Sequence, residues 1–461
     1  MVAPARNRRG RAFRHSVNFI WRALPIAATF AIAAILARLL LANAPAHLAT
    51  DLAQPVIVVT NWGRFGAALL GVLLAALAIG AIAYRRAIGC AGASSPLGIT
   101  IATGVALVAA WCMPVLFSSD LYAYAAYGEL TRLGHNPYTH SELNHANALI
   151  SAAAWQWGKA IPVCVYGPAF VALALAVVTV LAPLGTLAQL EGMRVVASAA
   201  LMLCIPLAYA AFPGDRTRRL AATAAIGLNP AAIWCAVEGH NDAIALAVAL
   251  MGFALVRRRL FGIGAAIVAL SGLVKAPGAA AAIALAAVER RARAGAVAGI
   301  ALFATLSLPL LVSLVSQMAP HGQYAPQASL QAAVAPIALL VLGNQRWASL
   351  AALLIAAGVC ALLARAGVAR LRRRADEGWI WLGLAAWVLI PNPYPWYGLW
   401  LVALAGLAVR SRAGGVAIAL SLTAALRYVP DAIAVPGPPG AVALGVLAML
   451  PLVGLLAPIN K

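Results

Sequence analysis

Apolar runs alternate with short charged clusters along nearly the whole chain. The first three runs cover about 23–42, 64–84 and 97–117. With a rise of 1.5 Å per residue, helices of this length can cross a bilayer. The runs are apolar throughout and do not alternate with polar residues, which favours helices over the strands of a barrel. The pattern therefore predicts an all-α polytopic membrane protein.

The later runs predict further helices, interrupted by polar loops. They cover about 194–212, 219–237, 243–256, 260–274, 278–289, 296–316, 331–343 and 347–367, followed by helix pairs that flank 391–397 and Asp431. The arginine-rich stretch from Arg6 to Arg22 lies in the cytoplasm by the positive-inside rule. The run after it is too long for a signal peptide and lacks a clear cleavage site, so it predicts a first membrane helix. Continuing the charge rule gives about fourteen spans with both ends inside.

The segment at about 118–192 is long and mixed, and it predicts a large outer loop. A full span at 166–183 would put the later arginine clusters outside, against the charge rule. We therefore expect this run to lie in or dip into the outer leaflet. The expected organisation is a basic cytoplasmic N-terminus (1–22), two N-terminal membrane helices (23–96), a membrane core with the large outer loop (97–400) and C-terminal membrane helices (401–461).

Composition excludes a soluble protein. Hydrophobic residues make up 64% of the 461 positions, charged residues make up 10%, and the mean hydropathy is +0.92. The net charge of +21 does not indicate nucleic acid, because the arginines stand in short clusters between apolar runs. Membrane lipids with anionic headgroups are their expected partners. The six cysteines form no CxxC pair and predict small core residues, with no disulfide or zinc framework.

The most distinctive polar stretch follows the third apolar run. Asp120 is the first ionisable group after that run, and aromatic and turn-forming residues follow it. Such a stretch suits a surface that binds a polar ligand, and its candidate ligand-binding residues are Tyr122, Tyr124, Asn136 and Tyr138. The alternative is that Asp120 only caps a short helix starting at Leu121, since Asp is a favoured N-cap residue.

The predicted topology gathers other unusual polar groups on the same outer face. They are Tyr166, Glu238, His240, Asn241, Asp242, Lys275, Trp396 and Tyr397. Asp or Lys at the centre of a membrane helix costs roughly 2.5–3.5 kcal/mol, so such residues usually mark a site or a substrate path. A carboxylate can act as general base on a sugar hydroxyl, and a cation can hold the phosphate of a lipid-linked donor.

Each of these residues also has a structural alternative. Lys275 could extend to the headgroups, although the adjacent Pro277-Gly278 breaks the helix where a buried anion could bind. Glu238 and Asp242 could cap helices, His240 could be a loop residue, and Trp396 and Tyr397 could be interfacial anchors. The three histidines 135, 140 and 145 have no metal-ligand spacing, so no metal site or cofactor is indicated.

Several motifs together resemble the C-type membrane glycosyltransferases. They are the Asp-x-Tyr-x-Tyr at 120–124 with Gly-x-Asn-Pro-Tyr at 134–138, Tyr166-Gly167-Pro168, Asn229-Pro230 with Gly239-His240-Asn241-Asp242, Lys275-Ala276-Pro277 and Pro395-Trp396-Tyr397. The likeness covers about residues 95–400. It is greatest to the polyprenyl-phosphomannose-dependent α-mannosyltransferases that have two additional N-terminal helices.

The resemblance implies the C-type glycosyltransferase fold and roles for individual residues. Asp120 would be the catalytic base of an inverting transfer from a β-linked donor, and Lys275 would contact the donor phosphate. No paired Asp-Glu or Asp-x-Asp adjoins Asp120, which leaves a required divalent metal without support.

The sequence thus predicts an inner-membrane hexosyltransferase, most simply a mannosyltransferase. It would use a polyprenyl-phosphate sugar donor and a glycan or glycolipid acceptor at the extracytoplasmic face. The main alternative is a multi-span transporter or flippase, which would show internal repeats and broken helices near the midplane. A non-catalytic scaffold is a third possibility, but it leaves Lys275 beside a helix break unexplained.

Overall fold

The computed structural model describes residues 6–143, 147–310, 326–433 and 437–456. Within these ranges the chain is almost wholly helical, and the only β-type pairing is an isolated bridge between Glu142 and Ala160. The prediction of an all-α polytopic membrane protein is therefore confirmed.

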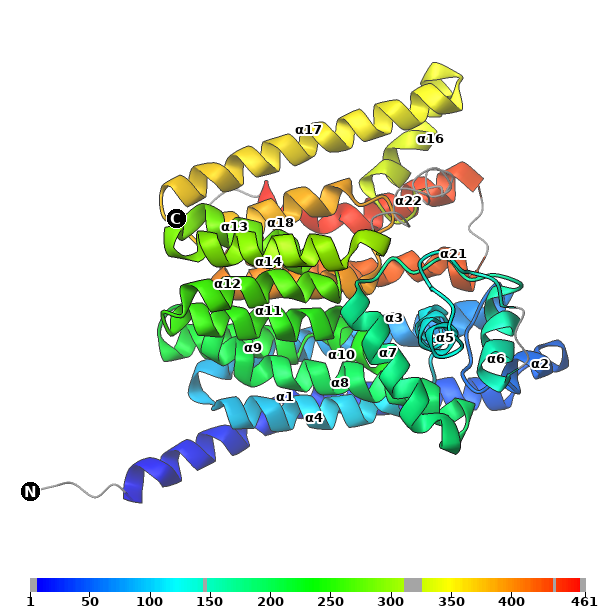
Figure 1. Ribbon diagram of the computed structural model, residues 1–461, viewed down its shortest axis with the longest axis horizontal. Coiled ribbons are helices and arrows are strands. Elements are labelled where there is room, and N and C mark those ends of the chain that lie inside the picture. Colours follow the sequence, from blue (N-terminus) through cyan, green and yellow to red (C-terminus); the bar gives the residue numbers. More distant parts are fainter. Residues whose placement is uncertain (1–5, 144–146, 311–325, 434–436, 457–461) are drawn as a thin grey trace, which may run out of the picture.

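Most of the helices, long and short, run side by side in one bundle, whose axis is horizontal in Figure 1. In the first half of the chain these are α1 (Arg6–Ala42), α3 (Gly63–Cys90), α4 (Pro96–Trp111), α8 (Thr186–Ala211), α9 (Arg216–Gly227), α10 (Pro230–Val237), α11 (Asp242–Arg257), α12 (Phe261–Leu270), α13 (Pro277–Val288) and α14 (Arg293–Leu306). In the second half they are α16 (Leu330–Leu342), α17 (Gln345–Arg372), α18 (Glu377–Leu389), α19 (Gly398–Ala405), α20 (Arg412–Thr423) and α22 (Gly437–Met449).

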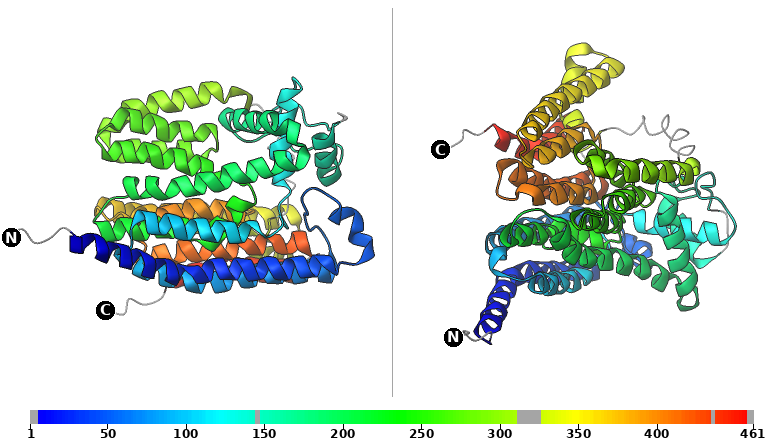
Figure 2. Two further views of the ribbon diagram at one scale, coloured as in Figure 1. Left: turned by 90° about the horizontal axis from the view of Figure 1, so that it is seen from below. Right: turned by 60° about the vertical axis from the view of Figure 1, so that its left-hand side comes forward.

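Three helices of the large loop lie across one end of this bundle. They are α5 (Asp120–Arg132), α6 (Ala148–Trp157) and α7 (Pro168–Leu181), and α5 is seen end-on at the right of Figure 1. The view turned by 90° shows α5 running across the bundle axis (Figure 2). The short helix α2 (Ala49–Leu52) lies beyond them, and α21 (Val429–Ala432) lies near the same end. The orientation of α7 agrees with a helix that does not simply cross the membrane.

The protein keeps many large aliphatic side chains on its surface. Ile35, Ile82, Leu203 and Leu354 are all about half exposed or more, and they belong to four different helices of the bundle. A soluble fold would bury such residues, whereas lipid tails accept them without cost. Six described helices are long and apolar enough to cross a membrane, or seven if the bent pair α9–α10 forms one span, and seven shorter apolar helices accompany them. The number of spans therefore stays a prediction.

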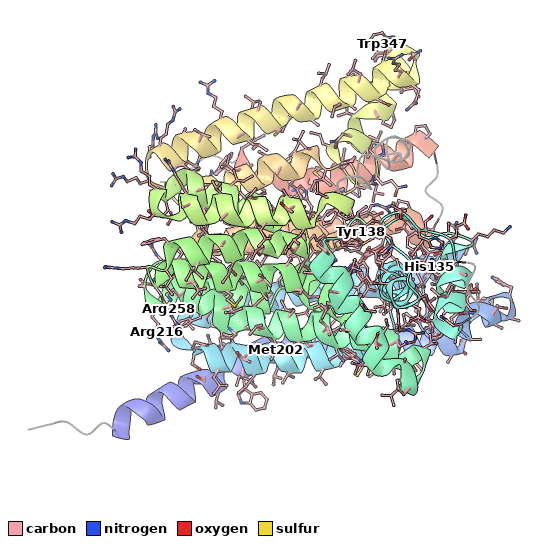
Figure 3. The ribbon with its side chains drawn as sticks, in the orientation of Figure 1. His135, Tyr138, Met202, Arg216, Arg258 and Trp347 are labelled. Atoms are coloured by element: carbon pink, nitrogen blue, oxygen red, sulfur yellow. The ribbon has the colours of Figure 1, made fainter. Side chains whose placement is uncertain are left out.

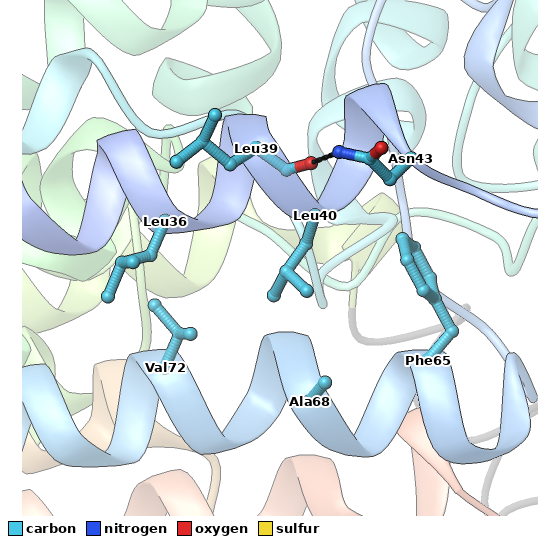
Figure 4. A pocket seen from close by; sticks show the side chains of 7 residues that line it. All are labelled: Leu36, Leu39, Leu40, Asn43, Phe65, Ala68 and Val72. Atoms are coloured by element: carbon cyan, nitrogen blue, oxygen red, sulfur yellow. Dashed lines mark hydrogen bonds between the residues drawn. The ribbon is translucent and has the colours of Figure 1, made fainter.

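An apolar groove of about 620 Å³ lies between α1 and α3. Leu36 and Leu40 of α1 face Phe65 and Val72 of α3 across it (Figure 4), and Leu39 also lines it. Asn43, the polar side chain at its edge, donates a hydrogen bond of 2.8 Å to the carbonyl oxygen of Leu39. A groove lined in this way offers lipid tails an apolar surface and no charged group.

Prolines shorten or break two of the predicted helices, and a third is slightly shorter than predicted. The run at 97–117 gives only α4, which ends at Trp111, because Pro114 disfavours helix for the residues just before it. The run at 219–237 is split into α9 and α10 with a bend of 46°, since Pro230 cannot continue the first helix. The run at 260–274 is helical only to Leu273, through α12 and a short 3₁₀ turn.

Two other boundaries also differ from the predictions. The run at 296–316 begins as α14, which ends at Leu306, and residues 308–310 are helical again; the loop residues His321, Gln323 and Tyr324 expected after it lie outside the described residues. At the start of the chain, α1 extends back to Arg6, so part of the basic N-terminus is helical.

Candidate active site

Asp120 is the first residue of α5, and its carboxylate is not used to cap that helix. Ser119 is the N-cap residue and makes no side-chain capping bond, while the hydroxyl of Tyr124 donates a hydrogen bond of 3.1 Å to Oδ2 of Asp120. Residues four apart lie on the same face of a helix, which brings these two side chains together. The capping interpretation of Asp120 is therefore wrong, and so is the expected helix start at Leu121.

Tyr124 connects Asp120 to two other segments of the chain. Its hydroxyl oxygen lies 3.3 Å from the hydroxyl oxygen of Tyr166, just before α7, and 3.4 Å from Nδ1 of His240, just before α11. The rings of Tyr124 and Tyr166 pack edge to face at 5.2 Å between centroids. This tyrosine pair packs beside the carboxylate of Asp120.

Tyr166 of this pair also lies near Lys275. The Lys275 Nζ is 5.7 Å from the centre of the Tyr166 ring and 5.0 Å from that of Tyr397. Gly167 permits this approach, because its backbone N–H donates to the carbonyl oxygen of Val274 at 3.3 Å and a Cβ there would collide with the carbonyl of Leu273. A glycine after Tyr166 thus lets the start of α7 pack directly on the Lys275 turn.

Lys275 forms an ion pair with the first residue of α11. Its Nζ lies 2.5 Å from Oδ2 of Asp242, and the indole N–H of Trp400 donates to the other carboxylate oxygen at 2.8 Å. Aromatic rings on two sides and a paired carboxylate hold the ammonium in one place. Lys275 therefore does not extend freely toward lipid headgroups.

A tight turn at residues 238–240 brings Glu238 and His240 close to Asp120. Gly239 between them has φ of +90°, a conformation that other residues rarely adopt. His240 Nε2 lies 3.8 Å from Oε2 of Glu238, and Nδ1 lies 3.9 Å from Oδ2 of Asp120. The imidazole thus stands between two carboxyl groups.

A stack of planar side chains fixes the His240 ring. The ring stacks on Trp396 at 3.8 Å and 20°, and Trp396 stacks on Tyr394 at 4.4 Å and 9°. Arg427 lies over the Tyr394 ring at 4.6 Å from its centre and pairs with Asp431. Because both faces of Trp396 are covered, its indole supports His240 and does not stand free as a membrane anchor.

We call Asp120, Tyr124, Tyr166, Glu238, His240, Asp242, Lys275, Trp396 and Tyr397 the polar cluster. Its charged side chains differ in how far they are exposed. The side chains of Asp120 and Lys275 are 23% and 11% exposed, whereas those of Glu238, His240 and Asp242 are at most 2% exposed. A substrate entering from outside would therefore meet the first two groups.

Burial shifts the ionisation of the groups in the loops. It raises the pKa of Asp120 to about 6, against the opposing effects of the Lys275 ammonium and the Tyr124 hydrogen bond. It raises the pKa of Glu238 to about 8, against the backbone N–H of Leu116. Burial and then the charge of Lys275 hold the pKa of His240 well below its usual value. At neutral pH these shifts favour an ionised Asp120 and a neutral Glu238 and His240.

The structure does not bring all predicted site residues into the polar cluster. Tyr122 is buried and exchanges two hydrogen bonds with the backbone of Val56. Asn136 accepts the backbone N–H of Tyr138 at 3.0 Å, which forms a local turn, and the hydroxyl of Tyr138 donates to the carbonyl oxygen of Tyr166. Asn241 is fully buried, and its amide has no hydrogen-bond partner among the residues that the structure describes.

Three residues of the site are absent from the sequence-based candidates. Trp400 binds Asp242, while Tyr394 and Arg427 complete the stack that supports His240. Tyr394 stands in the same Pro-rich stretch as Trp396, and Trp400 follows at helical spacing, so both could have been suspected. No sequence signal pointed to Arg427. It pairs with Asp431, four residues later, in a part of the chain far from the other site residues.

No group of three or more His, Cys, Asp or Glu in the described parts of the chain is placed to hold a metal ion. Within the part of the chain that the structure describes, the cysteines form no disulfide, and three of them are buried as small core residues. Cys112, in contrast, is exposed.

Comparison with known proteins places the chain in a family. Residues 24–293 match the model of the alpha-(1->6)-mannopyranosyltransferase N-terminal domain, and they make up more than half of the chain. Neither the curated proteins nor the solved structures yield a match. The matched region includes Asp120 and Lys275, and the fold that carries them is helical and membrane-embedded. The chain therefore belongs to the alpha-(1->6)-mannopyranosyltransferase family of membrane mannosyltransferases.

Proposed function

We propose that this protein transfers mannose from a polyprenyl-phosphate carrier to a glycan or glycolipid acceptor at the extracytoplasmic face of the plasma membrane. In this proposal the transfer inverts the anomeric centre. Asp120 is the general base and Lys275 contacts the donor phosphate. The family gives the class of reaction, while the carrier, the stereochemistry and the residue roles are the parts proposed.

One observation carries the proposal. A carboxylate and an ammonium, 155 positions apart in a chain of membrane helices, meet at the Tyr124–Tyr166 pair and are the charged side chains of the polar cluster that remain accessible. A sugar phosphate bound between them would have its acceptor side toward Asp120 and its phosphate toward Lys275.

The chemistry requires these two groups and no redox partner. The acceptor hydroxyl oxygen forms a bond to the anomeric carbon while its proton passes to Asp120. The bond from the anomeric carbon to the phosphate oxygen breaks, and the electron pair stays on the phosphate next to the Lys275 ammonium. A base and a cation on opposite sides of the sugar suit attack from the face opposite to the leaving group, which inverts the centre.

The distribution of arginines supports an extracytoplasmic site. Arg216 and Arg258 lie at the end of the bundle opposite to His135 and Tyr138 of the large loop (Figure 3). The last turn of α17, with Arg370 and Arg372, lies at that same arginine-rich end (Figure 1). By the positive-inside rule this end is cytoplasmic, so the polar cluster would face outward.

A lipid-linked donor fits the surroundings of Lys275. The residue stands at the turn into α13, whose apolar side chains Ile283 and Val288 are exposed toward the lipid. A phosphate bound at Lys275 could thus remain attached to a tail that stays in the bilayer. A water-soluble nucleotide sugar would gain nothing from such a position.

The transporter alternative has one feature in its favour, the broken helix α9–α10. Backbone groups on both sides of the break have internal partners, because the Tyr84 hydroxyl donates to the carbonyl oxygen of Ala225 and the side-chain oxygen of Asn229 accepts from the backbone N–H of Ala232. The residues at the break itself, Leu228 to Pro230, carry no charge. The break therefore lacks the ion or substrate site expected of a transporter.

An assay in detergent micelles separates the two functions. Purified protein is incubated with polyprenyl phosphomannose and, in parallel, with polyprenyl-phosphate donors of other sugars and with nucleotide mannose, plus short mannoside acceptors. The proposal predicts transfer from polyprenyl phosphomannose without any sealed compartment, and products of inverted configuration by NMR. Transfer from the nucleotide sugar alone, or no chemistry with any donor, would contradict it.

A further inference from the structure

Glu238 is a buried carboxyl group without a cation to neutralise it. Its Oε1 accepts the backbone N–H of Leu116 at 3.3 Å, and its Oε2 has no hydrogen-bond partner within the described ranges. The nearest guanidinium, that of Arg194, is paired with Glu191 and bound to the backbone carbonyl of Val237. An unpaired anion in such a place is costly, so the protonated form is favoured.

The free Oε2 faces another atom that lacks a partner. His240 Nε2 lies 3.8 Å away, is buried and has no hydrogen bond to any residue that the structure covers. A shift of about 1 Å would bring the two atoms to hydrogen-bonding distance. Only one proton is needed for this bond, and a neutral carboxyl group provides it.

The hydrogen bonds from Glu238 through His240 and Tyr124 to Asp120 would then all have the same donor-to-acceptor direction. If Oε2–H donates to Nε2 of His240, the neutral imidazole keeps its proton on Nδ1, which lies 3.4 Å from the hydroxyl of Tyr124. With that hydroxyl accepting from His240, its own proton points to Asp120 Oδ2 at 3.1 Å. Trp396 holds the imidazole plane in place by stacking at 3.8 Å.

We propose that Glu238 is a neutral hydrogen-bond donor that fixes the tautomer of His240, and that His240 in turn orients Tyr124 and the carboxylate of Asp120. Glu238 and His240 are then positioning residues and do not contact the sugar. This differs from the sugar-binding role suggested by their place in the sequence. The inference rests on the proposed role of Asp120 as base.

Several titratable groups face this chain of contacts from neighbouring elements. Arg194, Cys235 and Tyr428 surround Glu238, Lys275 acts on His240, and Lys275, Asp242 and Asp431 act on Asp120. The pKa of Glu238, raised to about 8 by burial, places its loss of the proton above neutral pH. Ionisation would remove the donor to Nε2, so activity should fall as the pH rises past this value.

Two substitutions of Glu238 separate a neutral donor from an anionic ligand. Glu238→Gln keeps a donor toward Nε2 and an acceptor for Leu116, and it cannot ionise. We expect this variant to keep kcat within about threefold of the wild type at pH 7 and to lose the decline near pH 8. Glu238→Ala removes the donor, so we expect kcat to fall by up to roughly 10²-fold with little change in KM for the donor. A Gln variant as impaired as the Ala variant, or one with only a raised KM, would overturn the inference.

A spectroscopic readout tests the same chain independently of turnover. Histidine-selective ¹⁵N labelling of the whole protein gives signals from seven residues, and comparison with His240→Gln assigns the one of interest. We expect the neutral Nδ1–H tautomer in the wild type and in Glu238→Gln, and a loss of this preference in Glu238→Ala. An Nε2–H tautomer or an imidazolium at pH 7 would overturn the inference. If the wild type transfers no sugar from a polyprenyl-phosphate donor, the proposed function fails, while this readout still decides the role of Glu238.

Discussion

At the level of single residues, the proposed mechanism makes Asp120 the group whose ionisation sets the rate. Its pKa is raised to about 6 by burial, and a general base must be ionised to accept a proton. We therefore expect kcat/KM to rise as the pH increases through about 6 and then to level off until the decline attributed to Glu238. The measurement is a pH profile between 5 and 9 with donor below its KM. A rate that stays constant from pH 5 to 7 would contradict this role of Asp120.

Lys275 can be tested by removing its charge together with that of its partner. Lys275→Met alone leaves Asp242 buried without a cation to pair with, which typically costs about 3–5 kcal/mol of stability, so the double variant Lys275→Met/Asp242→Asn is preferred. We expect the Kd for the lipid donor to increase by roughly 10- to 100-fold, because a contact to a charged phosphate is lost. Lys159→Met, at an exposed loop position, is the control. Unchanged donor binding in the double variant would assign Lys275 to structure alone.

The sequence was sufficient to identify the charged groups of the polar cluster but not the direction of every side chain. Asp120 and Lys275 stand out because they are ionisable groups at the ends of apolar runs. Tyr122 and Tyr124 look equivalent in the sequence, yet they point to different sides of α5, one to Val56 and the other to Asp120. Only the packing of distant segments around α5 distinguishes them.

At the level of elements, the start of α19 supports the site from a late part of the chain. The indole of Trp400 holds Asp242, which holds Lys275. We expect Trp400→Phe to weaken donor binding about tenfold, since a hydrogen bond to a buried carboxylate is lost. Trp387→Phe is a matched control, because its buried indole N–H has no partner in the described structure. Equal effects of the two substitutions would show that Trp400 only fills space.

Helix boundaries could be predicted where no proline interrupted the apolar run. The predicted start of α3 lies one residue from the observed one, while α4 ends six residues early and α9–α10 is broken. Pro114 and Pro230 are visible in the sequence, but they are overlooked when a helix is predicted only from the length of an apolar run. The prediction that the run at 166–183 lies in or dips into the outer leaflet came, in contrast, from counting charges on the two sides of the membrane, and it stays a prediction.

At the level of the whole molecule, the site draws on parts of the chain beyond the matched family region. Trp396, Tyr397 and Trp400 lie outside residues 24–293, yet they contact His240, Lys275 and Asp242. No local pattern relates these segments to Asp120. The order of the motifs along the chain could therefore suggest that these segments meet in one site. The number of residues between the motifs could not.

The proposed orientation can be measured with single cysteines in a variant whose six native cysteines are alanine. Thr139→Cys lies in the large loop and Arg258→Cys lies at the arginine-rich end, and both positions are exposed. We expect a membrane-impermeant maleimide to label Thr139→Cys in intact cells and Arg258→Cys only after permeabilisation. The reverse pattern would place the polar cluster in the cytoplasm.

The most direct test of the account is the turnover of Asp120→Asn with polyprenyl phosphomannose in detergent micelles. Asparagine can still accept the hydrogen bond from Tyr124 but cannot take a proton from the acceptor. We predict that the variant folds with an unchanged Tm, binds the donor with the Kd of the wild type, and transfers mannose roughly 10²–10⁴ times more slowly. Transfer at the wild-type rate would remove Asp120 from the mechanism and with it the central claim.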